Sequence, residues 1–116
     1  MRNFKEFVIW QKSHALCLKI YKVTASFPKT EVYGITSQMR RSSSSIPTNI
    51  AEGCGRRSDL HFRRFLTFAA GSTSELEYQV LLSKDLEFIT PEIFNLLTKD
   101  AIEIRKMIYS FCLKLK

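Results

Sequence analysis

Residues 33–58 read YGITSQMRRSSSSIPTNIAEGCGRRS, and this stretch predicts a helix that carries a proline, Pro47, in its interior. Over about Glu31–Gly53, apolar or small residues recur every four and three positions, as one buried helix face requires. They are Ile35, Met39, Ser42, Ile46 and Asn49 or Ile50. An interior proline costs a helix about 3 kcal/mol, so we expect a packing or kink requirement there. The helix should end in a glycine-flanked, doubly basic turn, Gly53–Ser58, where a polyanion could dock.

Three further stretches repeat apolar residues at the same spacing, and each starts with a residue type that favours a helix N-terminus. They lie at about Lys5–Phe27, Ser58–Phe88 and Thr90–Leu115, with Asn3, Ser58 and Thr90 as the expected caps. No stretch alternates apolar and polar residues as a strand would. Four helices with short connections predict an all-α fold, namely an antiparallel up-down four-helix bundle whose second helix contains the proline. The whole chain, 1–116, is expected to be one domain.

The composition is that of a basic globular protein. Lys and Arg number 18 against 11 Asp and Glu, which leaves a formal charge of +7. Such a surplus makes RNA or DNA a candidate partner. The three cysteines are odd in number and far apart, which favours a reduced, cytoplasmic setting. No zinc-ligand spacing and no membrane-spanning run is present, so we expect no metal, no cofactor and no membrane partner.

Three Arg-Arg pairs are candidate nucleic-acid contacts: Arg40-Arg41, Arg56-Arg57 and Arg63-Arg64. Adjacent helical residues point about 100° apart, so no pair forms a single clamp by itself. The last two pairs flank the start of the third helix, where backbone N–H groups and guanidinium groups can hold a phosphate. Alternatively, Gly53 and Gly55 simply end the second helix and the arginines pair with acids such as Glu52. The residues leave both interpretations open.

A row of lysines runs beside the buried face of the first helix. Lys5, Lys12 and Lys19 recur every seven residues, and Lys12 and Lys19 are further candidate contacts for nucleic acid. The alternative is a solvated flank whose aliphatic stems shield the core. The solvated flank is the favoured interpretation.

The third and fourth helices each carry a second apolar stripe outside the predicted core face. Phe68, Leu82 and Leu86 form the first stripe, and Ile102, Tyr109 and Leu113 form the second. Single exposed apolar residues are common on monomers, but two stripes favour self-association. We therefore expect these six residues at the interface of a homo-oligomer.

Candidates for catalysis are weak, and the chain is predicted not to be an enzyme. The serine run has no Gly-x-Ser-x-Gly elbow, and Cys54 has no evident partner base. His14 and His61 lack neighbouring acids or cysteines at ligand spacing. Glu75 and Glu77 lie two apart on a helix and do not face each other.

Several motifs together resemble one bacterial family, the four-helix bundles encoded in intervening sequences of 23S ribosomal RNA genes. The matching strings are WQK (10–12), YGITSQMRR (33–41), SIPTNIAEG (45–53), GRRS (55–58) and FLTFAAGSTSELEYQ (65–79). The resemblance runs over about Phe4–Ile89 and implies a small helical protein, ring-shaped homopentamers and no enzymatic activity. The family is similar to accessory proteins of diversity-generating retroelements, which bind nucleic acid and a reverse transcriptase. Members usually have Ala-Ala-Val where this chain has Ser42, Ser43 and Ser44.

The predicted function is therefore that of a non-catalytic, self-associating basic bundle that binds RNA or DNA through phosphate contacts. The alternative is a scaffold that recruits a protein partner and binds no nucleic acid. Replacing Arg56 and Arg57 with glutamate distinguishes the two classes, because only the first class needs these charges for its ligand.

Overall fold

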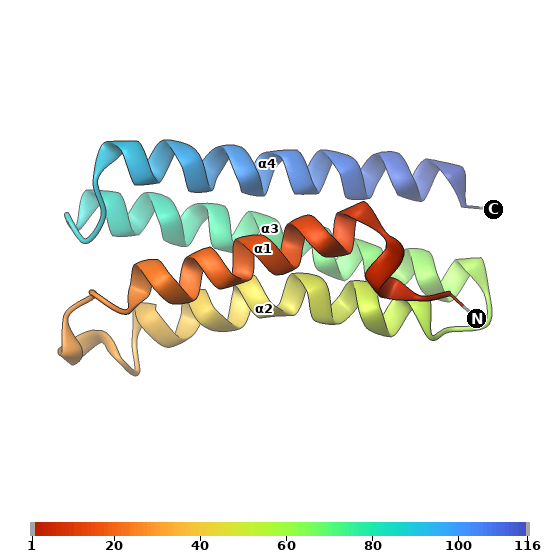
Figure 1. Cartoon of the computed structure of the whole chain (residues 1–116), viewed down its shortest axis with the longest axis horizontal. Helices are drawn as coiled ribbons and strands as arrows, with labels where there is room; N and C mark the ends of the chain where they lie inside the picture. Colours follow the sequence, from red (N-terminus) through yellow and green to blue (C-terminus); the bar gives the residue numbers. More distant parts are fainter. Residues whose placement is uncertain (1, 116) are drawn as a thin grey trace.

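The computed structural model describes residues 2–115, which form four long helices and no strand within that range. The helices are α1 (Val8–Thr24), α2 (Ile35–Cys54), α3 (Asp59–Asp85) and α4 (Pro91–Lys114). Each helix runs antiparallel to the one before it, in a bundle of 44 × 23 × 19 Å (Figure 1). The predicted all-α, up-down four-helix bundle is confirmed.

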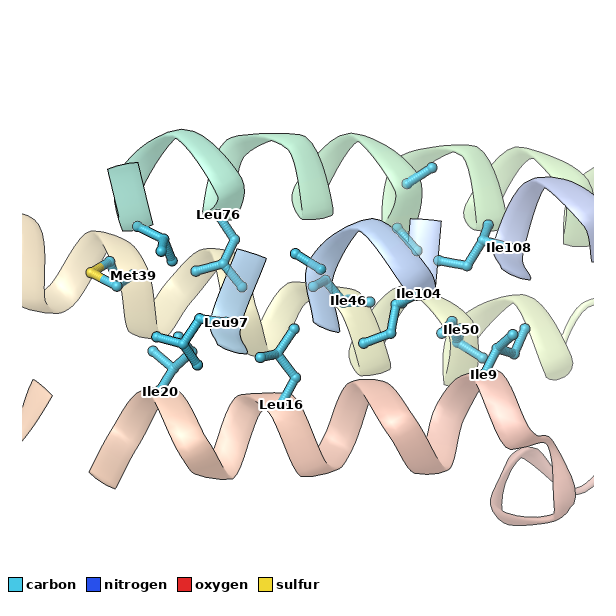
Figure 2. Packing of buried hydrophobic residues seen from close by; sticks show 14 of the residues in the cluster. Ile9, Leu16, Ile20, Met39, Ile46, Ile50, Leu76, Leu97, Ile104 and Ile108 are labelled. Atoms are coloured by element: carbon cyan, nitrogen blue, oxygen red, sulfur yellow. The ribbon is translucent and has the colours of Figure 1, made fainter. Parts of the chain in front are cut away.

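The four periodic faces meet in one core along the bundle axis. Figure 2 shows side chains from all four helices converging there, among them Leu16, Met39, Ile46, Leu76 and Ile104. Each is at most 1% exposed, and burying a side chain of this size contributes about 1.5–3 kcal/mol. The packing is most extensive between α2 and α3 and thinnest between α1 and α4.

The first helix starts later than predicted. Asn3 does act as a cap, but it caps a short 3₁₀ turn, Phe4–Glu6, through a 3.1 Å bond from the Lys5 N–H to Oδ1. Phe7 then takes an extended conformation before α1 begins at Val8. The ring of Phe7 lies 5.3 Å from the Phe111 ring, centre to centre. Phe7 therefore interrupts the predicted helix at a point where it packs against a distant part of the chain. Local helix signals did not predict this interruption.

Two other boundaries also differ from the prediction. After Pro28, residues 29–31 form a second 3₁₀ turn, so α2 begins at Ile35 and not near Glu31. At the far end of α3, Glu87 adopts a left-handed conformation with φ 64°, and the Phe88 N–H bonds the Ser83 carbonyl at 2.8 Å. These are features of a Schellman ending, which stops α3 before Phe88. The predicted caps Ser58 and Thr90 are both confirmed, since each side chain accepts a bond from the N–H three residues on.

The serine run of α2 is interior packing. Helix α2 continues through Pro47, which is buried, and the run Ser42–Ser45 lies two to five residues before it. The Ser43 and Ser44 hydroxyls donate to carbonyls three residues back, each at 3.2 Å, and the Ser42 oxygen lies 3.2 Å from the Met39 carbonyl. These hydroxyls therefore contact carbonyls that precede the Ser43 carbonyl, which is the one that Pro47 leaves without a backbone donor. Their small volume is consistent with the close packing of α2 on its neighbours.

Gly53 has a packing role near the end of α2. A Cβ on this residue would lie 2.8 Å from Cδ1 of Phe62 and 3.0 Å from Cβ of Phe65. The helix α3 backbone therefore approaches α2 more closely here than any larger residue allows.

Candidate nucleic-acid interface

Basic residues gather at one end of the bundle. The N-terminal segment, the α2–α3 turn and the last turn of α4 all lie there (Figure 1). Within the described chain its basic residues are Arg2, Lys5, Arg56, Arg57, Arg63, Arg64 and Lys114, and its acids are Glu6, Glu52 and Asp59. We call this region the basic end. The opposite end carries Lys22, Lys29 and Lys84 against Glu31, Asp85, Glu87 and Glu92. The positive charge of the chain is therefore unevenly distributed along the bundle axis.

The centre of the basic end is the turn between α2 and α3. The Gly55 N–H bonds the Glu52 carbonyl and the Arg56 N–H bonds the Gly53 carbonyl, both at 3.1 Å, which closes α2. The Ser58 hydroxyl then accepts the His61 N–H at 3.1 Å and starts α3. Gly53 and Gly55 therefore do end α2, as the second of the two interpretations expects. Arg56 and Arg57 lie between the C-cap of α2 and the N-cap of α3, and both side chains are exposed.

A hollow of about 600 Å³ opens at this turn, lined by Arg2, Cys54, Gly55, Arg56 and Arg57. The Cζ of Arg56 lies 4.6 Å from the centre of the Phe65 ring, so an aromatic side chain supports this guanidinium. Arg57 makes no ion pair or side-chain hydrogen bond to any of residues 2–115. The pairing of these arginines with acids such as Glu52 is not seen in the described residues.

Arg2 was not among the predicted site residues, although it lines the same hollow. It forms an ion pair with Asp59, donates to the Arg56 carbonyl at 3.1 Å, and lies over the Phe62 ring at 4.5 Å. These contacts tie the N-terminal segment to the start of α3. No local sequence signal pointed to Arg2, because its partners lie more than fifty residues away.

The third arginine pair is divided by its position on α3. Arg63 donates to the Leu115 carbonyl and thereby holds the end of α4 against α3. Arg64 is exposed and, like Arg57, has no ion pair or side-chain hydrogen bond within the described range. Adjacent residues on a helix point about 100° apart, so Arg63 can contact the end of α4 while the charge of Arg64 stays free.

The remaining predicted contacts lie away from the basic end. Arg40 is half-buried near the end of α1, bonding the Thr24 hydroxyl at 2.9 Å, whereas Arg41 beside it is exposed. Lys12 pairs with Glu103 at 2.9 Å and Lys19 pairs with Asp100 at 2.7 Å. The hydrogen bond and charge of Lys12 lower the pKa of the Glu103 carboxyl. The lysine row therefore connects α1 to α4 across their thin seam.

Cys54, His14 and His61 were the candidates for catalysis or metal binding, and the structure shows the surroundings of each. Burial raises the pKa of the Cys54 thiol to about 11, although the charge of Arg2 acts in the opposite direction. His14 stacks on Trp10 with ring centres 4.9 Å apart, and His61 is exposed. Among residues 2–115 no group of three potential metal ligands converges. No helix in this range is long and apolar enough to span a membrane.

The predicted interface residues lie outside the core. Phe68, Leu86, Tyr109 and Leu113 are 52%, 48%, 52% and 87% exposed, while Leu82 and Ile102 are half-buried. Leu60 and Tyr78, which the prediction did not include, extend the α3 stripe and are 60% and 61% exposed. Gly71 falls within this stripe, and a Cβ there would meet no atom within 4 Å. No contact among the described residues explains a glycine in the middle of α3.

The chain is similar to known proteins in both sequence and structure. Residues 5–110 match the family described as 23S rRNA-intervening sequence protein. A crystal structure from Bacteroides thetaiotaomicron VPI-5482, of a protein of unknown function in the S23 ribosomal protein family, is similar with a TM-score of 0.82. The two sequences are 29% identical, and the alignment covers 90% of this chain and 98% of the other. No curated protein sequence matches significantly.

Proposed function

The chain belongs to the 23S rRNA-intervening sequence protein family, and on this premise we propose that it is a non-catalytic, self-associating bundle that binds RNA or DNA. The basic end is the proposed binding surface. The observation that carries the proposal is the pair of exposed, unpaired arginines, Arg56 and Arg57, that line one hollow at this end. Arg64, on the second turn of α3, is a third exposed arginine without a partner in the described residues. Guanidinium groups are well suited to phosphate because their N–H donors match its oxygens.

The proposed contacts are with the phosphate backbone and not with bases. Helix α3 begins within the basic end, so its N-terminal N–H groups add a partial positive charge beside the arginines. Binding of this kind has low sequence specificity and depends steeply on salt, because each contact releases a counterion. For three contacts on a single strand, affinity should fall about 20-fold between 50 and 200 mM salt.

The test is a titration of fluorescently labelled RNA and DNA, read by anisotropy at these two salt concentrations. The variant Arg56→Glu/Arg57→Glu should lose at least about tenfold in affinity. The matched control is Lys22→Glu/Arg41→Glu, which changes net charge equally at exposed residues away from the basic end and outside the two apolar stripes. Equal losses in both variants would show a general charge effect and contradict the site. An assembled wild-type protein that binds neither polymer at low salt would leave the protein-recruiting scaffold as the function.

Self-association is supported by the two outward apolar stripes. On α3 and its C-cap the stripe contains the exposed residues Leu60, Phe68, Tyr78 and Leu86, together with the half-buried Leu82, which also packs against the core. On α4, Ile102 lies in a hollow of about 590 Å³ between Lys99, Lys106 and Met107. Patches of this kind on a small domain mark interfaces. Light scattering should report a closed oligomer, for which the family resemblance proposes five subunits, and a monomer at micromolar concentration would contradict it.

A further inference from the structure

A second hollow lies at the connection between α1 and α2, at the end of the bundle opposite Arg56 and Arg57. It measures about 360 Å³ and is lined by Thr24, Ala25, Phe27, Pro28, Lys29, Val32, Thr36 and Arg40. We call it the corner hollow. Its size is that of a small-molecule pocket. Its walls combine apolar side chains with two basic groups and two hydroxyls.

The Thr36 hydroxyl in this wall has no hydrogen-bond partner among the described residues. Thr36 is 6% exposed, so water does not compensate for the missing bond as it would at the surface. Buried polar atoms are almost always paired, and an unpaired one costs stability. A ligand oxygen in the hollow would provide the missing partner.

Arg40 supplies an uncompensated charge to the same hollow. Its Nε bonds the Thr24 hydroxyl at 2.9 Å, its Nη2 bonds the Tyr21 carbonyl at 3.3 Å, and the group lies over the Tyr21 ring at 4.7 Å. These contacts close the end of α1 and hold the guanidinium in place. They leave Nη1 free, and no carboxylate within residues 2–115 pairs with this half-buried arginine. Glu31, the acid of the neighbouring 3₁₀ turn, instead lies against Gly34 and does not line the hollow.

The available donors fit a phosphate better than a carboxylate. Because Nε and Nη2 of Arg40 are occupied, the side-on bidentate clamp that favours a planar carboxylate is not available. Arg40, Lys29 and Thr36 instead line the hollow as three separate side chains, and single donors from different directions suit the several oxygens of a tetrahedral phosphate. Phe27, Pro28 and Val32 offer an apolar wall for the body that carries it.

We propose that the corner hollow binds a small organic phosphate monoester, with its phosphate on Arg40, Lys29 and Thr36 and its apolar or aromatic body against Phe27, Pro28 and Val32. This site is separate from the proposed nucleic-acid surface. Arg40 therefore contributes to a different ligand than the polymer contact predicted for it from the sequence.

Isothermal titration of the full-length protein with AMP and phenyl phosphate tests the proposal, with adenosine, inorganic phosphate and phenylacetate as comparison ligands. Both phosphate monoesters should bind more tightly than the three comparison ligands. Thr36→Val and Lys29→Gln should each weaken them about tenfold, as loss of one charge-assisted bond does. The matched control is Thr98→Val, since Thr98 carries the other unpartnered buried hydroxyl and lies on α4.

Unfolding temperatures of the variants distinguish a lost ligand contact from a damaged fold. Thr36→Val and Thr98→Val should both raise the unfolding temperature, because each removes an unpaired buried hydroxyl, while only Thr36→Val weakens the ligand. A lower unfolding temperature for Thr36→Val would show that the hydroxyl is already paired, by a water for instance, and would overturn the proposal. So would phosphate binding that Thr36→Val and Lys29→Gln leave intact, or no binding of either ester. Arg57→Gln should retain ester binding, which separates this site from the basic end.

Discussion

The Ser42 hydroxyl donates to Oε1 of Gln79 at 2.6 Å, and this bond joins α2 to α3 inside the bundle. Both residues are buried, and Gln79 also reaches the Glu75 carboxylate at 3.4 Å through Nε2. This polar pair lies between helices that pack mainly through apolar side chains. It converts an apolar contact between helices into a directional one.

Replacing one partner should cost more than replacing both. We expect Ser42→Ala to lower the free energy of unfolding by about 1–2 kcal/mol, because the buried Gln79 carbonyl loses its donor. Ser42→Ala/Gln79→Leu should recover most of that loss, since two apolar partners leave nothing unpaired. Urea unfolding of the four members of this cycle measures the coupling. A double variant no more stable than the sum of the single changes would contradict the pairing.

Gly53 and Gly55 should respond in different ways to the same substitution. Gly53→Ala places a Cβ 2.8 Å from the Phe62 ring and should cost about 1–3 kcal/mol through overpacking. Gly55→Ala meets only the Glu52 carbonyl at 3.5 Å, with φ −81°, and should leave the free energy of unfolding nearly unchanged. Thermal or urea unfolding of the two variants makes the comparison, and equal effects would show that the α2–α3 contact is not close.

Gly71 tests the proposed self-association. In an isolated subunit Gly71→Ala should raise the free energy of unfolding by about 0.5–1 kcal/mol, because alanine is the better helix former and the space is open. If a second copy approaches α3 at this point, the same change should weaken the assembly. Sedimentation velocity over a dilution series measures the second effect. Stabilisation without any change in assembly would place Gly71 outside the interface.

Cys54 should be an unreactive thiol at neutral pH. Burial raises its pKa to about 11 from the usual 9.0, so the thiolate that reacts is scarce. A variant with Cys17 and Cys112 replaced by alanine isolates its reaction with a thiol probe. The rate at pH 7.5 should be below that of the same chain unfolded in urea, and a faster rate would show an activated thiol.

The same shift has a consequence for stability at high pH. An acid whose pKa is higher in the folded state favours folding below its unfolded pKa and loses that contribution as pH rises through the folded value. The free energy of unfolding should therefore fall between about pH 9 and pH 11. Cys54→Ala should show a smaller fall over this window, and an identical fall would assign the effect to other groups.

The fold could be predicted from the sequence because its signals are local. Four-and-three spacing found every helix, and Ser58 and Thr90 marked two starts that the structure confirms. Boundaries were wrong where distant contacts intervene, as when Phe7 packs on Phe111 and α1 begins three residues late. The left-handed Glu87 gave no sequence signal, because glycine or asparagine normally occupies that position.

The candidate site could be predicted only in part. The turn containing Arg56 and Arg57 was found from its composition, and its hollow and the free Arg64 are consistent with the prediction without testing it. Lys12 and Lys19 remain a prediction as ligand contacts, but both are engaged with acids on α4. Arg2 and the corner hollow were missed altogether, since no residue near either one in the chain reveals its partners.

The sequence by itself determined the helices, their order and the family, because helix periodicity, capping and turn chemistry act within a few residues. Tertiary structure alone decided which charges are free. Arg2, Arg63 and Lys12 are held by Asp59, the Leu115 carbonyl and Glu103, all more than fifty residues away along the chain. An ion pair depends on distance in space, so only packing separates arginines that stabilise the bundle from those left to bind a ligand.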